Sequence, residues 1–480
     1  MTRNSINQLL IMTDEHTRKV LGCYGNHLVK TPNLDRLAAR GTLFTDAYCN
    51  VPICVPSRAS FATGRYGHQT RHWDNATPYC GTPNSWAHEL QGAGISVGSI
   101  GKLHYRNESD SVGLDFQQIP MHIVNGVGDV LGCVREPLPK RWKSRNMAEK
   151  IGPGETSYTS YDRDISTRAA EWITSQQDET DPWVLFVSMI APHFPLIAPQ
   201  EFYDQYAEAG LMPTKARPNP EHPWHAAMRE CIVMDNFTPE RTRIALASYY
   251  ALVTFIDSRI GLILDALDDA GLQDRTQVIY VSDHGDQVGE RDLWGKSNMF
   301  EESVGIPCII AGPNVPKGKV CRTPVSLVDV APTVLQTAGI AGTIGDRPGQ
   351  SLVDMANAED DLDRVVFAEY QAMGAIAGAF MIRKGRWKYV HYLGMNPELY
   401  DLYADPDELN NLGVDPAYSK ICLELEQELR QICTPEQVDQ HAREDQARII
   451  ATHGGQEFIV SKGGFGATPP PGEAVQYGKS

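Results

Sequence analysis

The sequence of 480 residues lacks three features, and each absence argues against a class of protein. No stretch approaches the roughly 18 apolar residues that a membrane-spanning helix needs. The ten cysteines include no Cys-x-x-Cys pair, which makes a structural zinc site improbable. Positive charge is scarce, since 43 Lys and Arg face 60 Asp and Glu, and the net charge of -17 would repel nucleic acid or an anionic membrane. Any anion must therefore be bound by a local cluster of basic groups.

Size and the first residues indicate a soluble enzyme. The N-terminus is polar, and the apolar run from Leu9 to Met12 is too short for a signal-peptide core, so we expect a cytoplasmic protein with mostly buried thiols. Apolar residues make up 42% and charged residues 21%, which is ordinary for a globular enzyme. A chain of this length exceeds what one hydrophobic core supports. We therefore expect one large domain and a smaller one.

The most unusual stretch, CVPSRASFATGR, runs from Cys54 to Arg65. Its two arginines stand where a short apolar segment would otherwise enter a core, and this placement indicates an anion. Taken alone, Cys54 is most simply a buried residue that ends a loop. The alternative is a nucleophilic thiolate whose pKa is lowered by Arg58, one helical turn further on.

Two apolar runs far apart in the sequence both end in acids. LLIMTDE ends with Asp14 and Glu15, and QVIYVSDHGD carries Asp283 and His284. Both have the form of central parallel strands whose carboxyl ends open on a site. Two such ends can bring oxygen ligands onto one hard cation. A mixed set of oxygen and nitrogen ligands suits Mn²⁺ as well as Ca²⁺.

Cys-x-Pro-Ser-Arg followed by Thr-Gly-Arg resembles the signature of the type I sulfatases, which belong to the alkaline phosphatase superfamily. Gly-Lys-x-His at Lys102 and His104 resembles their second signature. Asp-His at 283–284 resembles the branch that includes choline sulfatases and phosphonate monoester hydrolases. The resemblance reaches about residue 412. It implies an α/β fold with a mixed central sheet between helices, plus a smaller C-terminal α+β domain.

The resemblance also implies a mechanism. Cys54 would be oxidised to formylglycine (3-oxoalanine) by a maturation enzyme, and one hydroxyl of the hydrated aldehyde would attack the sulfur of a sulfate ester. Asp14, Cys54, Asp283 and His284 would hold one divalent cation, Ca²⁺ or Mn²⁺. Glu15 stands where the commonest form of the family has Asp, and its role as a ligand stays open.

Further roles come from the same resemblance. Lys102 would hold the sulfate, and His104 would accept a proton from the remaining hydroxyl so that the covalent hemiacetal collapses. The two residues are two apart after a β-like run, so we expect them on one face of an extended chain. Arg58 joins this catalytic set. Taken alone, a Lys-x-His pair at a strand end is a polar edge.

Three loop residues complete the expected site. Asn75, after Trp-Asp, would place an amide near the anion, although a lone Asn is usually a turn residue. His193 lies in a Pro-His-x-Pro loop after a buried strand, and by resemblance it contacts the leaving-group side of the sulfate. Lys296 matches a family lysine that touches the sulfate. We expect His193 and Lys296 to bind substrate and to protonate or stabilise the departing alkoxide.

The expected domains are a catalytic domain (1–375), an antiparallel-sheet subdomain (376–453) and a Gly/Pro-rich tail (454–480). The tail is too rich in Gly and Pro to form its own core, so it is either disordered or wrapped around a neighbouring subunit of a homo-oligomer. Thr238 caps a long predicted helix that ends at Ala270.

The pair His222 and His225 superficially resembles a metal site. The intervening Pro223 cannot lie inside a regular helix, and no acid or cysteine repeats the spacing elsewhere. We expect this segment to be a surface loop or part of the substrate rim.

Three functions are compatible with these residues. The first is hydrolysis of a small sulfate ester, such as an aryl, sugar or other small-molecule ester, by a formylglycine enzyme. The second is the same machinery acting on phosphonate monoesters or phosphate diesters, and it shares every residue named above. The third is a non-catalytic protein that binds sulfate esters, which the intact signatures disfavour. The sequence leaves the alcohol of the substrate open.

Overall fold

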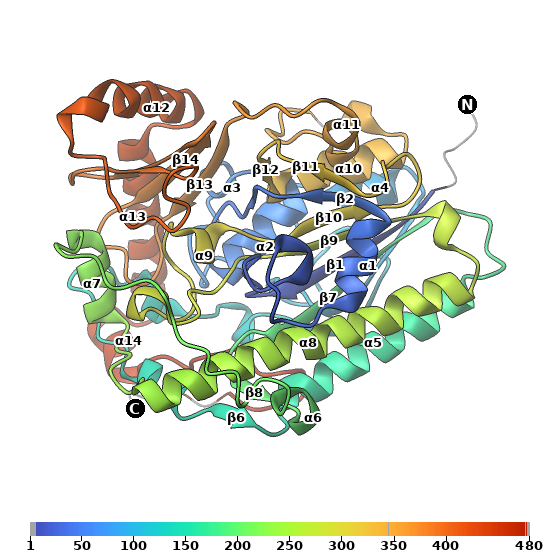
Figure 1. Cartoon of the computed structure of the whole chain (residues 1–480), viewed down its shortest axis with the longest axis horizontal. Coiled ribbons are helices and arrows are strands. Elements are labelled where there is room, and N and C mark those ends of the chain that lie inside the picture. Colours follow the sequence, from blue (N-terminus) through green and yellow to red (C-terminus); the bar gives the residue numbers. More distant parts are fainter. Residues whose placement is uncertain (1–5, 344, 476, 478–480) are drawn as a thin grey trace.

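The core of the protein is an eight-stranded mixed sheet, seen in a computed structural model that describes residues 6–343, 345–475 and 477 (Figure 1). The strand order is β11-β2-β10-β9-β1-β7-β4-β5. At the centre, β1 (Asn7–Asp14) runs parallel to β7 (Trp183–Pro192) and to β9 (Thr276–Ser282). The other strands are β2 (Gly41–Phe44), β4 (Ser96–Lys102), β5 (Phe116–Met121), β10 (Cys308–Ala311) and β11 (Lys319–Cys321). Because β10 is antiparallel to both neighbours, the predicted mixed sheet is confirmed.

Helices cover both faces of this sheet. In β1, Leu9 and Ile11 pack toward one face, whereas Leu10 and Met12 pack toward the other, as the period of two in a buried strand requires. One face carries α1 (Pro32–Ala39), α5 (Ser157–Ser175) and α8 (Pro239–Asp269). The other carries α2 (Cys54–Thr63), α4 (Trp86–Gly92) and α10 (Val330–Thr337). Figure 1 shows the long helices α5 and α8 side by side under the sheet.

The long helix was predicted correctly. Helix α8 begins at Pro239 after Thr238, whose side chain accepts a hydrogen bond from the backbone N–H of Arg241. Inside α8, Asp257 accepts the N–H groups of Asn33 and Leu34 at the start of α1, at 3.2 and 2.8 Å. Asp257 therefore joins two helices.

A second, antiparallel sheet forms the C-terminal part, in the order β13-β14-β15-β16. Its strands are β13 (Val366–Tyr370), β14 (Ala379–Lys384), β15 (Trp387–Tyr392) and β16 (Glu398–Asp401). Helices α12 (Ser419–Ile432) and α13 (Pro435–Thr452) follow it. The predicted smaller α+β part is confirmed, but a boundary at residue 376 would separate β13 from β14, with which it pairs.

A buried network of opposite charges joins the two sheets. Glu301 and Glu302, in α9 (Glu301–Val304), lie between cations of both parts of the chain. Lys388 of β15 reaches Glu301 at 3.0 Å and Glu408 at 2.7 Å. On the catalytic side, Arg18 contacts Glu301, whereas Lys19, Lys215 and Arg291 contact Glu302. Each ion is buried, apart from Lys19, so its charge depends on its partners.

The expectation of a loop around the two histidines was wrong. His222 is the N-cap of helix α7 (Pro223–Cys231), in which Pro223 occupies the first position, where its missing N–H costs nothing. His225 and Trp224 are buried, and the Trp224 indole donates to the carbonyl of Ala377. Helix α7 therefore packs against the C-terminal sheet.

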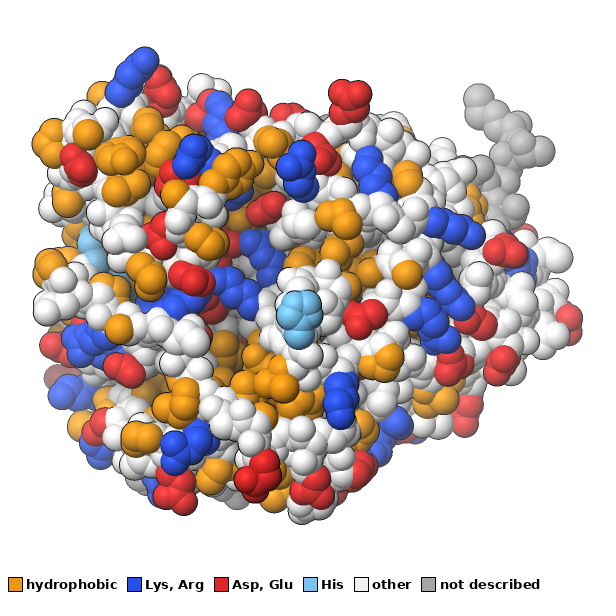
Figure 2. Space-filling view, viewed as in Figure 1, with side chains coloured by type: hydrophobic (Ala, Val, Ile, Leu, Met, Phe, Trp, Pro, Cys, Tyr) orange, Lys and Arg blue, Asp and Glu red, His pale blue; other side chains and the backbone are white. Residues whose placement is uncertain are grey.

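Charge is mixed on the surface. On the face shown in Figure 2, basic and acidic side chains of the described residues are interspersed. Of the cations predicted to bind an anion, Arg58 and Lys102 lie inside, 1% and 2% exposed. Arg65 does not, because it is only partly buried and pairs with the exposed Asp346. Among the described residues, no helix is both long enough and apolar enough to cross a bilayer.

Candidate functional site

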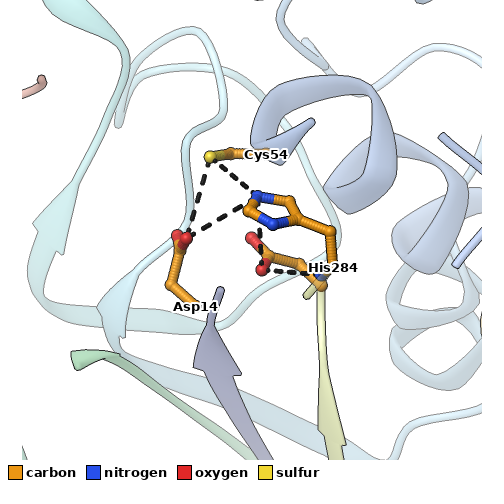
Figure 3. Close-up of side chains that lie close together, drawn as sticks. Asp14, Cys54 and His284 are labelled. Atoms are coloured by element: carbon orange, nitrogen blue, oxygen red, sulfur yellow. Dashed lines mark hydrogen bonds and ion pairs between the residues drawn. The ribbon is translucent and has the colours of Figure 1, made fainter. Parts of the chain in front are cut away.

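The residues predicted for the site meet at the carboxyl ends of β1 and β9. Cys54 is the first residue of α2, and its sulfur lies 3.2 Å from Nε2 of His284 and 3.7 Å from Oδ1 of Asp14 (Figure 3). Asp14 ends β1, and Asp283 and His284 follow β9 directly, so the pairing of these strands brings the groups together. The predicted juxtaposition is therefore present.

The environment of Cys54 does not favour a thiolate. Burial, aided by the charge of Asp14, raises the pKa of the Cys54 thiol to about 11. Arg58 donates instead to Oδ2 of Asp283 at 2.8 Å and to Oδ2 of Asp14 at 3.2 Å. Its remaining hydrogen bonds, each 2.8 Å, go to the carbonyl of Lys102 and the hydroxyl of Ser188. Arg58 thus orients the two acids.

Four groups fit a divalent cation. One ligand atom from each of Asp14, Cys54, Asp283 and His284 lies within 4.8 Å of the others, and all four residues are buried. Carboxylate oxygens and an imidazole can together hold a divalent cation, and Arg58 fixes one oxygen of each acid. Burial alone would raise the pKa of Asp14, but Lys102, His193 and Arg58 hold it well below its usual range, so Asp14 is an anion.

Glu15 faces away from this cluster. Its backbone has φ 68°, a left-handed conformation that is rare outside glycine, and its N–H donates to Oδ1 of Asp283 at 3.2 Å. Its carboxylate instead contacts Nζ of Lys296 at 2.8 Å and Nε2 of His193 at 3.2 Å. With Asp14, Glu15 and His193 form a second group of potential ligands. Glu15 therefore holds the two residues expected to serve the leaving group.

Lys102 and His104 both border the site, but their local geometry differs from the expectation. Strand β4 ends at Lys102, and His104 has φ 54°, so the chain is not extended between them. Lys102 donates to Asp14. His104 is 5% exposed, and neither ring nitrogen has a hydrogen-bond partner among the described residues. Burial, with the charges of Lys102 and Arg58, lowers the pKa of His104 well below its usual value, which leaves a neutral base.

Asn75 lies beside the start of α2. Its Oδ1 accepts the N–H of Val55 at 3.1 Å, so its amide nitrogen is left to bind another acceptor. The preceding Asp74 accepts the side chain of Gln446 at 2.9 Å, which ties this turn to α13. The side chain of Asn75 is thus held by the start of α2, and its turn is held through Asp74 by α13.

Two buried residues were missed. Asp162 of α5 accepts the N–H groups of Ile190 and Ala191, at 2.7 and 2.8 Å, and so fixes the end of β7 that leads to His193. Ser188 of β7 accepts from Arg58. Neither residue lies in a motif. The sequence around Asp162 predicts a helix and the sequence around Ser188 predicts an apolar strand, and neither pattern indicates a functional residue. Their roles become visible only in the hydrogen bonds of the folded chain.

A pocket opens over this cluster. Its volume is about 380 Å³, and its lining includes Cys54, Asn75, Lys102, His104, His193 and Lys296. Apolar side chains, three basic residues (Lys140, Arg141 and Lys143) and residues 460 and 463–468 of the tail also line it. The tail residues that line the pocket therefore pack on their own chain.

The chain matches known proteins along most of its length. The profile of the Sulfatase family matches residues 6–340, and the profile of the N-sulphoglucosamine sulphohydrolase C-terminal domain matches residues 289–434. A choline-sulfatase of Rhizobium meliloti (strain 1021) is 34% identical over 434 residues, which cover 87% of this chain and 84% of that protein. Arylsulfatase K of Danio rerio is 29% identical over 459 residues, covering 89% and 83%.

Solved structures agree on the architecture. The crystal structure of a phosphonate monoester hydrolase of Agrobacterium radiobacter superimposes with a TM-score of 0.72 at 23% identity, covering 89% of this chain and 95% of that one. At this identity the likeness concerns the fold alone. It supports the mixed central sheet with an antiparallel C-terminal sheet.

Proposed function

The chain belongs to the sulfatase family and is a sulfuric ester hydrolase, and from this premise we propose that it cleaves sulfate esters through a formylglycine hydrate formed at Cys54. The observation that carries the proposal is the position of the Cys54 sulfur, between His284 and Asp14 at the floor of the pocket. When formed, the hydrate supplies one hydroxyl that attacks sulfur and a second whose deprotonation releases sulfate.

The floor of the pocket is built to hold a sulfate group. Lys102 and the amide nitrogen of Asn75 reach this end of the pocket, and Cys54 lies at the positive N-terminus of α2. A divalent cation held by Asp14, Asp283 and His284 would supply further positive charge to the sulfate oxygens. Because these groups are buried, their attraction for an anion is screened little by water.

His104 is suited to remove a proton at the floor of the pocket. Its ring is buried, neutral and without a partner among the described residues, so a nitrogen lone pair can accept a proton from a hydroxyl at position 54. Both Lys102 and Arg58 lower the pKa of His104, which favours loss of that proton afterwards. His104 can thus take up a proton, release it and serve as the base again in the next turnover.

His193 and Lys296 are suited to the leaving group. Both line the pocket, and both contact one carboxylate, that of Glu15. Burial would lower the pKa of Lys296, but nearby anionic groups raise it well above its usual value. Of these, the carboxylates of Glu15 and Asp14 remain when Cys54 is converted to formylglycine, so the ammonium is retained. Lys296 would stabilise the departing alkoxide by its charge and could pass it a proton. Burial, with the charge of Lys296, lowers the pKa of His193 well below its usual value, so His193 would assist the leaving group as a neutral ring.

Mass spectrometry of the peptide that contains Cys54, taken from active enzyme, tests this proposal. We expect the mass of the aldehyde in place of the thiol, and loss of sulfate ester hydrolysis in Cys54→Ala. Full activity of a preparation whose Cys54 is entirely unmodified would refute the mechanism. Rates with 4-nitrophenyl sulfate and with a 4-nitrophenyl phosphonate monoester, measured side by side, separate the proposed reaction from phosphonate hydrolysis.

A further inference from the structure

Part of the pocket wall comes from a segment outside both family profiles, which end at residues 340 and 434. Helix α14 (Gln456–Lys462) packs through Ile459 against Leu131. The next residue, Gly463, has φ 73° and ψ -178°, a conformation essentially open only to glycine. This turn brings residues 463–468 against the pocket.

The segment is anchored beside the leaving-group residues. The phenol of Tyr158 donates to the backbone carbonyl of Thr468. The ring of Tyr158 meets the ring of His193 edge to face, with centroids 6.2 Å apart and an interplanar angle of 62°. Because Tyr158 also lines the pocket, the tail is connected by one side chain to a residue of the proposed catalytic set.

Away from the proposed catalytic residues, the pocket lining combines apolar side chains with basic ones. The apolar side chains include Leu131, Met147, Phe194, Ile232, Met234 and Phe465, and the basic residues are Lys140, Arg141 and Lys143. Among the described lining residues, the carboxylates are Glu15 and Asp129 alone. Glu15 contacts Lys296 and His193, and Asp129 accepts from Arg141 at 2.7 Å. No uncompensated anion is therefore offered to a positively charged alcohol by the described residues.

The aromatic rings of the wall are also partly engaged. Trp142 already has two cations of its own chain over its ring, Lys140 at 5.5 Å and Arg145 at 4.7 Å. One face of Trp294 is covered by Phe237, with centroids 4.5 Å apart at 15°. An ester of a cationic alcohol would therefore lose the hydration of its positive charge on binding. That charge would lie near Lys140, which has the same sign, and would gain no new carboxylate partner from the described residues.

We propose that residues 463–468 form a specificity wall that selects sulfate esters of uncharged apolar alcohols, aromatic ones above all, over esters of cationic alcohols. This inference rests on the proposed sulfatase reaction and names its substrate class. A volume of about 380 Å³ accommodates the sulfate group and a small ring system. Phe465 is the aromatic side chain that the tail itself contributes to the wall.

A pair of non-hydrolysable sulfonates tests the charge preference without the influence of leaving-group reactivity. In 4,4-dimethylpentane-1-sulfonate a quaternary carbon replaces the nitrogen of 3-(trimethylammonio)propane-1-sulfonate, so the two differ in charge and hardly in shape. As inhibitors of 4-nitrophenyl sulfate hydrolysis, we expect the neutral compound to bind about tenfold more tightly, because it loses no charge hydration. Equal or tighter binding of the cationic compound would overturn the proposal.

Matched variants of the full chain test the role of the tail. Phe465→Ala should weaken binding of the neutral sulfonate about tenfold, because an aromatic wall contact is lost. Phe458→Ala is the control, since this ring lies in the same segment but is 55% exposed and does not line the pocket. Equal effects of the two substitutions would remove the tail from the specificity wall.

A second pair tests the anchor. Tyr158→Phe removes the hydrogen bond to Thr468 and keeps the ring, so it should weaken binding of the neutral sulfonate. Tyr161→Phe removes the bond from the same helix to the carbonyl of Ile119 and should have no such effect. An unchanged inhibition constant in Tyr158→Phe would contradict the anchor. If the wild-type protein hydrolyses no sulfate ester, that result refutes the proposed function and not only the specificity wall.

Discussion

Replacing Glu15 by Gln gives the sharpest test of the proposed site. The carboxylate is 1% exposed and contacts Lys296 at 2.8 Å and His193 at 3.2 Å. Burial raises the pKa of Glu15 well above its usual value, and the charge of Lys296 opposes this shift. Because Nζ of Lys296 lies only 2.8 Å away, we describe the pair as ammonium and carboxylate. Gln keeps one acceptor oxygen and loses the charge, so it can retain one of the two contacts. A hydrogen bond to a charged group contributes about 1.5–3 kcal/mol, so loss of one corresponds to roughly a 10- to 150-fold loss in rate when that contact is needed.

The loss should depend on the leaving group. Removing the charge of Glu15 lowers the pKa of Lys296, whose ammonium it helps to maintain. A poor leaving group needs protonation or a nearby cation in the transition state, whereas an activated phenolate needs little of either. We therefore expect the full loss in kcat/KM with esters of weakly acidic phenols and less than about a threefold loss with 4-nitrophenyl sulfate.

The assay is kcat/KM for wild type and Glu15→Gln across aryl sulfates of graded leaving-group pKa, together with the metal content of each protein. The slope against leaving-group pKa should become steeper in the variant, and the metal content should stay unchanged. A uniform loss across the series with loss of metal would show that Glu15 is a cation ligand, and an unchanged slope would remove its role toward Lys296 and His193.

Three further predictions address other parts of the molecule. Asp283→Asn should lose the cation and at least about a thousandfold in kcat, since it removes a ligand that Arg58 orients, and metal analysis beside kinetics checks this. Lys102→Ala should reduce kcat/KM alike for good and poor leaving groups, because Lys102 serves the sulfate; a slope change would contradict this role. Burial opposes ionisation of Glu398, but His225 and Tyr392 hold its pKa at about 2, below the ordinary 4.5. Its contribution of about 3 kcal/mol is present above pH 4.5 and is lost as pH falls toward 2. Glu398→Gln should therefore destabilise at pH 7 and much less at pH 3 in urea unfolding, whereas Glu436→Gln, at a half-exposed pair with Arg430, should change little at either pH.

Local patterns of the sequence predicted the strands that carry the acids and the helix that carries Cys54. The alternation and length of buried runs identify β1 and β9, and their shared direction places Asp14 near Asp283. The second signature predicted Lys102 and His104 as neighbours in the site. It did not predict that β4 stops between them, because the left-handed φ of His104 depends on its surroundings and not on its residue type.

Contacts across long stretches of sequence could not be read from the residues. Nothing near Glu15 shows that its side chain turns to Lys296, 281 positions away, in preference to the cation ligands. Helix α7 was mistaken for a loop because Pro223 breaks a helix in its interior but begins one at its first turn. The composition of the tail left open whether it is disordered or wraps a neighbouring subunit, and it could not show that Ile459 would pack against Leu131 and Val134 of the same chain.

The buried charges between the two sheets restrict how this chain can be recombined. Lys388 and Glu408 come from the C-terminal part, and Glu301 comes from the segment that follows the Asp283-His284 loop. An enzyme that received its C-terminal sheet from a relative without a matching lysine would bury Glu301 with one partner fewer, at a cost of about 3–5 kcal/mol. Exchange of that sheet between family members therefore requires both sides of the charge pattern to be inherited together.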